Sequence, residues 1–309
     1  MSCNCAPIVL FVYNRPWHTL KTLESLYENE LANCSTLYVF ADGPKDKSSS
    51  QQIKDIEKTR SVVKQKQWCK DVVIVERNEN IGLSNSVING VSEIVNKHGK
   101  IIVLEDDLVL SRNFLKYMNE ALNLYLNHNN IYSINAYMFP INFDNNCTFL
   151  LPYISSWGWA TWKNKWDYFD QNISTEDINA INNNQVLKRR FNLENYDYAH
   201  MLKYSTNSWA IKWYYSVFIK HGLNVFPTMT MVKNIGFDGS GTNCPIDEQT
   251  NKNFSFNNYV NIEADVKLNL NNYNLYLSYF VKPKKSLAKK ITSRLKKCLK
   301  RLSTLLLVK

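Results

Sequence analysis

Residues 101–110 read Ile-Ile-Val-Leu-Glu-Asp-Asp-Leu-Val-Leu, an apolar run with several β-branched residues that contains three adjacent carboxylates. Such a run is typical of a buried strand in a parallel sheet. An isolated Glu-Asp-Asp usually marks a strand that ends in a solvated acidic turn. Here the apolar residues resume at Leu108, so the acids interrupt a core element. The pattern therefore favours a functional site over a surface turn.

The three carboxylates, Glu105, Asp106 and Asp107, need a compensating cation. Two ionised carboxylates about 4 Å apart repel each other by roughly 4 kcal/mol at the effective dielectric of a protein surface. Oxygen ligands suit Mg²⁺ or Mn²⁺, ions that usually keep coordination positions open for substrate phosphates. In an extended segment residues 105 and 107 face one side and residue 106 faces the other. One strand end can therefore present carboxylates to a metal ion on one side and to a second ligand group on the other.

Around this strand the chain alternates apolar runs typical of strands with segments of helical periodicity. The strand-like runs are 7–13, 36–41, 71–76, 100–104 and 131–136. The helix-like segments lie near 17–30, 50–67, 83–98 and 112–127. The alternation predicts an α/β fold with a mostly parallel, doubly wound sheet and helices on both faces.

Polar or special residues follow each of the first four strands. These segments are Asn14-Arg15-Pro16, Asp42-Gly43-Pro44, Arg77-Asn78-Glu79-Asn80 and the carboxylate triplet. Ligands of such sheets bind beyond the carboxyl ends of the strands, so we expect the four segments at one binding edge. The chain has no Gly-x-Gly-x-x-Gly, Walker sequence or Gly-rich, Arg-containing loop after its first strand. This disfavours a classical dinucleotide fold, a P-loop enzyme and a nucleotidyltransferase.

The chain has 37 Lys and Arg against 27 Asp and Glu, and the basic excess lies at its end. Residues 282–309 hold 11 of the basic residues and no acidic one, which leaves 26 against 27 in residues 1–281. The nearly neutral body has no basic stripe, so we expect no nucleic-acid partner. Seven cysteines without a Cys-x-x-Cys pair argue against a disulfide framework and a structural zinc site. They fit a reducing cytoplasm, as does an N-terminus without signal-peptide features.

The motifs at the strand ends resemble those of glycosyltransferases of the GT-A fold, most closely N-acetylglucosaminyltransferase I and related bacterial sugar transferases. The resemblance covers roughly residues 6–245. It is strongest over residues 103–118, Val-Leu-Glu-Asp-Asp-Leu-Val-Leu-Ser-Arg-Asn-Phe-Leu-Lys-Tyr-Met, which look like the family's Glu-Asp-Asp motif and the helix after it. It implies a Rossmann-like GT-A fold with an elaborated C-terminal half. It also implies an inverting hexosyl- or N-acetylhexosaminyltransferase that uses Mn²⁺ or Mg²⁺.

The resemblance further implies a role for each donor-site residue. Asp107 would be the direct metal ligand, with Glu105 and Asp106 toward the ribose and the donor sugar. Arg15, in Tyr-Asn-Arg-Pro, would lie near the uridine and phosphates of a UDP-sugar, and Asp42, in Ala-Asp-Gly-Pro, would contact the base. The other donor-binding residues would be Gly43 and, in the turn Asn-Ile-Gly-Leu-Ser, Asn80 and Gly82.

Residues 155–162, Ser-Ser-Trp-Gly-Trp-Ala-Thr-Trp, open a second half rich in aromatics. Trp159, Trp162 and Trp166 are spaced by three and four, which predicts the buried stripe of a helix rather than a sugar platform. Trp157 precedes the stripe among small residues. We expect its turn to form part of the donor or acceptor pocket, where a flat ring suits the apolar face of a sugar.

The general base is where the chain departs from the family pattern. Inverting members use a carboxylate near the start of a helix resembling residues 208–214, Ser-Trp-Ala-Ile-Lys-Trp-Tyr, where this chain has Ala210. The best substitute is Asp238, in the Gly-rich stretch 234–242, which could fold over the site as a lid. The alternative for Asp238 is an ordinary Asp-Gly turn. Without a substitute base the protein would be a catalytically impaired sugar-nucleotide-binding protein.

The end of the chain carries apolar residues at helical spacing on one face and basic residues on the other. The apolar positions are Leu287, Ile291, Leu295, Cys298, Leu302 and Leu305. Such a helix lies on an anionic membrane, where each basic residue contributes about 1 kcal/mol. The alternatives are a disordered basic tail and a helix that docks on a partner protein. We therefore predict a cytoplasmic protein, peripheral at the inner face of the cell membrane.

These features predict three segments. They are a nucleotide-sugar-binding α/β half at 1–138, an acceptor-binding half of the same GT-A domain at 139–281, and a basic amphipathic tail at 282–309. The predicted function is transfer of a sugar from a nucleotide-diphosphate donor to a glycan or lipid-linked acceptor. The alternatives are the impaired binding protein, and an interaction module whose α/β body only supports the basic tail.

Overall fold

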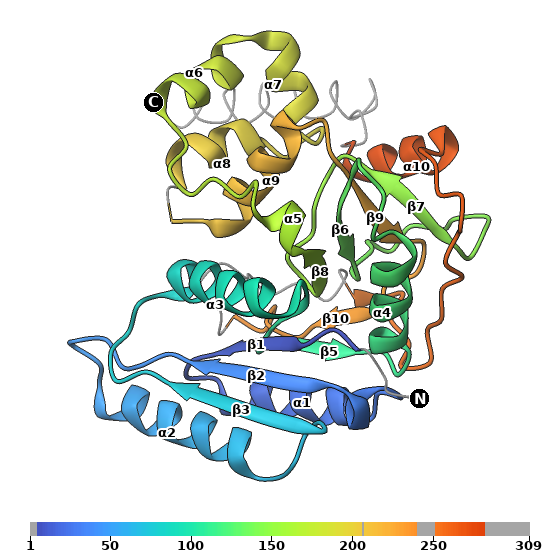
Figure 1. Ribbon diagram of the computed structural model, residues 1–309. Coiled ribbons are helices and arrows are strands. Elements are labelled where there is room, and N and C mark those ends of the chain that lie inside the picture. The colour runs from blue at the N-terminus through green and yellow to red at the C-terminus, as the bar shows by residue number, and fades with distance from the viewer. Residues whose placement is uncertain (1–4, 206, 240–250, 282–309) are drawn as a thin grey trace, which may run out of the picture.

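The computed structural model describes residues 5–205, 207–239 and 251–281 (Figure 1). In the first half strands and helices alternate, in the order β1 (Ile8–Val12), α1 (Pro16–Tyr27), a short 3-10 helix η1 (Ala32–Cys34), β2 (Thr36–Ala41), α2 (Ser50–Lys64), β3 (Asp71–Glu76), α3 (Leu83–His98), β4 (Lys100–Glu105), β5 (Leu108–Leu110), α4 (Phe114–Leu124) and β6 (Ile131–Asn135). All five predicted strands and all four predicted helices are confirmed, each end within one helical turn of its predicted position. The carboxylate run divides at Asp106 and Asp107, which form the turn between β4 and β5.

The second half carries shorter strands and a group of helices. Its elements are β7 (Thr148–Leu151), β8 (Trp159–Trp162), α5 (Lys163–Trp166), α6 (Thr175–Asn183), α7 (Gln185–Phe191), α8 (Tyr198–Tyr204), α9 (Trp209–Ile219), β9 (Leu223–Pro227), β10 (Val232–Asn234) and α10 (Leu270–Phe280). Ser174, Asp197 and Ser208 cap helices α6, α8 and α9, because their side chains accept hydrogen bonds from backbone N–H groups of the first turn. The predicted amphipathic helix of the tail lies outside the described residues. No helix in the described part of the chain is long and apolar enough to cross a membrane.

One eight-stranded sheet spans both halves, in the order β3-β2-β1-β4-β8-β6-β9-β7. Six strands run in one direction, while β8 and β7 are antiparallel to their neighbours. Strand β8 enters from the second half between β4 and β6, so the two halves share one sheet. A separate two-stranded sheet pairs β10 with β5 in antiparallel register.

Helices cover both faces of this sheet, which confirms the doubly wound arrangement. Along β1, Ile8, Leu10 and Val12 pack with apolar residues of α1, α2 and α4. The alternate residues Val9 and Phe11 pack with α3 and α9 on the other face. Figure 1 shows α1 and α2 on one side of the strands and α3 on the other. A third apolar cluster joins β7 and β9 to helices α7 through α10.

The sequence predicted that Trp159, Trp162 and Trp166 form the buried stripe of a helix. They are buried, as predicted, but they do not lie on one helix. Trp159 and Trp162 are the two ends of strand β8, and Trp166 ends the single turn α5. All three are at most 4% exposed. They face different clusters, because Trp159 and Trp166 pack beside α3 and α9 whereas Trp162 packs beside α4. The spacing of three and four thus arose from a strand followed by a tight turn.

Candidate functional site

Chain segments from the first half meet at the carboxyl ends of strands β1 to β4. The registers pair Val12 with Ala41, Ala41 with Glu76, and Phe11 with Glu105, so the parallel strands end nearly level. The loops that follow carry the predicted donor-site residues of the first half to one edge of the sheet. This is the edge at which sheets of this kind bind ligands.

Helix α1 holds the turn that carries the carboxylates. The hydroxyl of Thr22 donates to the backbone carbonyl of Asp106 at 2.9 Å and accepts from the N–H of Leu108 at 3.1 Å. One helical turn later, the hydroxyl of Ser25 accepts from the N–H of Leu110 at 3.0 Å. The backbone polar groups of β5 that face α1 are therefore paired with buried hydroxyls. The turn between β4 and β5 is fixed against the helix that begins just after Arg15.

Arg15 forms an ion pair with the carboxylate turn. Its Nη1 lies 2.9 Å from Asp107 Oδ2 and 3.5 Å from Asp106 Oδ1. The side chains of Arg15, Asp106 and Asp107 are 17%, 12% and 11% exposed. Burial opposes the charged form of Arg15, but the two aspartates outweigh burial and raise its pKa. The arginine is therefore a permanent cation in a largely desolvated site.

If all three carboxylates were ionised, they would carry more negative charge than Arg15 balances. Burial raises the pKa of Glu105 to about 8, and the charges of Asp107 and Asp106 add to the rise. Burial, followed by the charge of Asp107, also raises the pKa of Asp106, although Arg15 lowers it. A divalent cation fits this set of hard oxygen donors. Within the described ranges no three His, Cys, Asp or Glu side chains are grouped so as to hold a metal ion by themselves. An ion at Asp107 would take its other ligands from water or substrate phosphates.

The buried carboxylate of Asp42 braces two loops of the binding edge. It accepts hydrogen bonds from the backbone N–H groups of Gly43 and Ile81, both at 3.1 Å, and of Gly82 at 3.0 Å. These bonds join the loop after β2 to the loop after β3. The predicted contact of Asp42 with a nucleotide base stays a prediction, while the structure gives this carboxylate a structural role.

Gly43, Asn80 and Gly82 complete the contact between these loops. A Cβ at Gly43 would lie 2.5 Å from the backbone nitrogen of Glu79, so only glycine fits there. The side-chain N–H of Asn80 donates to the carbonyl of Gly43 at 3.0 Å. Gly82 precedes α3 with a φ of +80°, a left-handed conformation that glycine adopts without strain. The start of α3 therefore opens at the same edge as Arg15 and Asp107.

A loop from the second half, residues 234–238, covers the carboxylate turn; we refer to it as the Asp238 loop. It follows β10, and the N–H of Ile235 donates to the carbonyl of Asp107 at 2.8 Å. Gly236 packs directly on the Asp107 carboxylate. A Cβ there would meet Asp107 Oδ2 and would lie 3.0 Å from Nη2 of Arg15. Within the stretch 234–242 predicted as a lid, residues 235 and 236 thus lie on Asp107, whereas residues 240–242 lie outside the described residues.

The Asp238 loop also brings Trp157 to the site. The rings of Trp157 and Phe237 are 5.3 Å apart at 76°, and the Tyr137 ring lies 4.3 Å from Trp157 on another side. The turn that contains Trp157 is anchored to β6, because the N–H of Ser155 donates to Oδ1 of Asn135, the last residue of β6, at 2.8 Å. Trp157 is partly buried between these rings. Trp157 therefore lies beside the Asp238 loop that covers the carboxylates, and its place in a donor or acceptor pocket stays a prediction.

Asp238 lies beside the first turn of α1, where it contacts a residue that the sequence reasoning missed. Its Oδ2 is 2.9 Å from Nε2 of His18. The Asp238 side chain is 44% exposed, whereas the His18 side chain is 9% exposed. His18 follows Arg15, the N-cap of α1, by three residues, so the two lie on one side of the helix start. That spacing was the available signal for His18.

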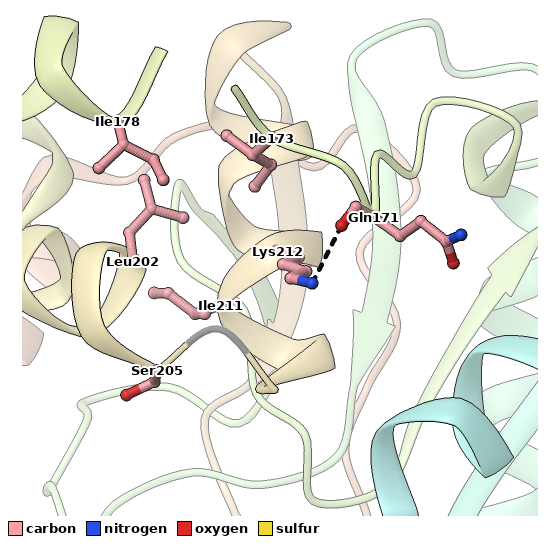
Figure 2. Close-up of a pocket in the computed structure, with 7 residues that line it drawn as sticks. All are labelled: Gln171, Ile173, Ile178, Leu202, Ser205, Ile211 and Lys212. Carbon is pink, nitrogen blue, oxygen red and sulfur yellow. Dashed lines mark hydrogen bonds between the residues drawn. The ribbon is translucent and has the colours of Figure 1, made fainter. Parts of the chain in front are cut away.

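Ala210 lies in the first turn of α9 and packs against the tryptophan cluster around Trp159 and Trp213. A cavity of about 160 Å³ adjoins this helix start (Figure 2). Its lining residues are Gln171, Ile173, Ile178, Leu202, Ser205, Ile211 and Lys212. Lys212 donates to the carbonyl of Gln171 at 3.0 Å. The described lining contains no carboxylate, so the base expected at this helix start has no substitute among these residues.

A larger hollow of about 610 Å³ lies where β9 begins, at the opposite end of the sheet from the carboxylates. Arg189, Glu194, His221 and Tyr273 are among its lining residues. Neither hollow is lined by a residue of the carboxylate turn. Among the described residues, the Asp238 loop covers the carboxylate turn.

No protein-family model and no curated protein sequence matches this chain. Solved structures give low-identity matches. Staphylococcus aureus TarS matches at 13% identity and a TM-score of 0.29, over 46% of this chain and 23% of TarS. The apo form of mouse xyloside xylosyltransferase 1 matches at 10% identity and a TM-score of 0.37, over 70% of this chain and 82% of that one. UDP-glucose pyrophosphorylase complexed with UDP-glucose matches at 11% identity and a TM-score of 0.32, over 53% of this chain and 79% of that one. At these identities and TM-scores the matches assign no function to this chain.

Proposed function

We propose that the chain is a metal-dependent glycosyltransferase that moves a sugar, with inversion, from a nucleotide-diphosphate donor to an acceptor hydroxyl. The observation that carries the proposal is the meeting of Arg15, the turn of Asp106 and Asp107, and the Asp238 loop beyond the carboxyl ends of the strands. It combines a buried cation, hard oxygen donors and a separate carboxylate at the ligand-binding edge of an α/β sheet.

The first two groups suit the leaving diphosphate. Mg²⁺ or Mn²⁺ bound at Asp107 would act as a Lewis acid on the diphosphate oxygens. The guanidinium of Arg15 matches phosphate geometry and is always charged. It is held 2.9 Å from Asp107, so a bound diphosphate would compete with this carboxylate for Arg15. The N-terminus of the 16-residue helix α3 opens at the same edge and favours negative charge there.

The third group suits the acceptor. Asp238 is much more exposed than Asp106 and Asp107, at 44% against 12% and 11%. An acceptor hydroxyl can therefore approach Asp238 from solvent while the donor lies against the covered turn. We assign Asp238 as the general base that takes the hydroxyl proton, in place of the carboxylate missing at Ala210.

The finer assignments are proposals of the same kind. The donor is a UDP-sugar carrying a hexosyl or N-acetylhexosaminyl group, and the acceptor is a glycan or a lipid-linked glycan. The tail at 282–309, outside the described residues, attaches the protein to the inner face of the cell membrane. The presence of Ala210 supports a second candidate, a sugar-nucleotide-binding protein with impaired turnover.

The test is nucleotide release by the purified full chain from a panel of nucleotide sugars, with Mn²⁺ and with EDTA. We expect release from one donor class with Mn²⁺ and its loss in Asp107→Asn. Asp265→Asn is the matched control, because Asp265 is 78% exposed and forms a surface ion pair with Lys267. Wild-type turnover in Asp107→Asn would refute the metal assignment. Donor binding without release by the wild type would favour the impaired binding protein.

A further inference from the structure

His18 is a buried imidazole aimed at the candidate general base. It lies in the first turn of α1, one turn after Arg15, and its side chain is 9% exposed. The Trp17 ring stands edge-on to it at 4.9 Å and 89°. A ring held in this way on a helix has little freedom to move. Its Nε2 reaches Asp238 Oδ2 at 2.9 Å across 220 positions of sequence.

The proton on this contact belongs to the histidine. Burial lowers the pKa of His18, Arg15 lowers it further, and Asp238 offsets only part of this effect. The lowered pKa favours the neutral imidazole. An ionised carboxylate only accepts hydrogen bonds, so Nε2 carries the hydrogen and donates to Asp238 Oδ2. Among the described residues, the charged groups that face His18 are Arg15, Asp238 and Asp107.

The contact with His18 orients a carboxylate that is itself partly exposed. Residues 234–236 are fixed by the β10–β5 pairing and by the contact of Gly236 with Asp107, and Phe237 is fixed by Trp157. The Asp238 side chain lies beyond these anchors and is 44% exposed. A half-exposed aspartate samples several rotamers, and general-base catalysis requires hydrogen-bond reach of the substrate proton.

We propose that His18 is a positioning residue, whose Nε2–H holds the Asp238 carboxylate in the orientation that accepts the acceptor's proton. This inference rests on the proposed function. In the step that Asp238 serves, the acceptor hydroxyl gives its proton to the carboxylate as its oxygen bonds to the anomeric carbon. The bond from that carbon to the diphosphate oxygen breaks, and the diphosphate leaves with the electron pair. His18 keeps its own proton throughout.

The test compares His18→Phe, which removes the donor, with His18→Gln, which keeps an N–H donor. We expect His18→Phe to lower kcat roughly 10- to 100-fold with a less than about threefold change in the donor KM. His18→Gln should recover most of this loss. In Asp238→Ala the His18→Phe change should have no further effect, because His18 acts through Asp238. His98→Phe is the matched control. His98 forms a hydrogen bond with Tyr38 at the C-terminal end of α3, away from the candidate site.

The pH profile and the histidine spectrum give independent measurements. His18→Phe should move the acidic limb of kcat to higher pH, because loss of an N–H donor makes a carboxylate easier to protonate. In the wild type, nitrogen NMR of His18 should show the hydrogen on Nε2. A hydrogen on Nδ1 alone, or a His18→Phe effect that persists in Asp238→Ala, would overturn the inference even if one variant folds poorly. A wild type that releases nucleotide from no donor would instead refute the proposed function.

Discussion

Replacing Gly236 by alanine should separate the Asp238 loop from the carboxylate turn. The Cβ of the alanine would lie 3.0 Å from both Asp107 Cγ and Arg15 Nη2, and closer still to Asp107 Oδ2. Gly236 does not have a left-handed backbone, so alanine adds a clash without dihedral strain. Asp107 cannot give way easily, because Arg15 and the α1 hydroxyls hold its turn. The loop is the part that must move.

The expected magnitude follows from overpacking, which costs about 1–3 kcal/mol for an added methyl group in a filled site. If the Asp238 loop moves away from Asp107 instead of compressing the site, the overpacking free energy becomes the cost of returning the loop to its closed position. The closed population then falls by about 5- to 150-fold, since each 1.4 kcal/mol is tenfold. We expect kcat to fall by a factor in this range. The free energy of unfolding should change by less than about 1 kcal/mol, because opening a surface loop relieves the clash.

The assay is nucleotide release with the best donor, together with chemical denaturation of the same samples. Gly222→Ala is the matched control, because a Cβ there would lie 2.5 Å from the Tyr132 ring and 2.7 Å from Val217. That clash lies at the opposite end of the sheet from the carboxylates. Gly222→Ala should therefore lower the free energy of unfolding by about 1–3 kcal/mol and leave kcat nearly unchanged. The two glycines should show opposite patterns of stability and activity.

Wild-type kcat in Gly236→Ala would show that the loop need not lie on Asp107 during turnover, and would refute this reasoning. If Gly236→Ala lowered the free energy of unfolding as much as Gly222→Ala does, the Asp238 loop could not open, and the surrounding core would have to accommodate the clash. An increase in kcat would mean that the covered arrangement is inhibitory. Donor access, rather than loop closure, would then limit turnover.

Three further predictions concern the base, the carboxylates and the tail. Asp238→Asn should lower kcat far more than it weakens donor binding measured by calorimetry, as expected for a group that acts mainly in the transition state; equal losses would make Asp238 a turn residue. In EDTA, the free energy of unfolding should fall as pH rises from 4.5 toward 8, because native Glu105, with a pKa of about 8, keeps a proton that the unfolded chain has lost. Glu105→Gln should flatten this dependence in denaturation curves, and an unchanged slope would contradict the assignment. Deletion of residues 284–309 should release the protein from anionic vesicles in sedimentation while leaving donor hydrolysis intact, because the remaining body is nearly neutral. A truncated protein that still sediments would place any membrane contact in the body.

Several features were readable from the sequence because they depend on local pattern. Apolar runs separated by helical periodicity predicted β1 to β4, β6 and helices α1 to α4. Parallel strands joined by helices end at one edge, so the positions of Arg15, Asp42 and Asp107 at that edge followed from where each strand stops. Adjacent carboxylates inside a core run marked the turn that carries them. None of these inferences required knowledge of which distant segments touch.

Only the tertiary structure decided the contacts between segments far apart in sequence. Trp159 and Trp162 have a spacing that fits a helix, yet they form strand β8. Pairing of β8 with β4 on one side and β6 on the other outweighs the local periodicity. Two of the amides bound by Asp42, those of Ile81 and Gly82, come from another loop, which no spacing rule reveals. His18 and Asp238 meet only because β10 pairs with β5 and returns the chain to α1. Such contacts depend on packing of the whole chain, so the site residue that sequence reasoning missed is one whose partner lies 220 positions away.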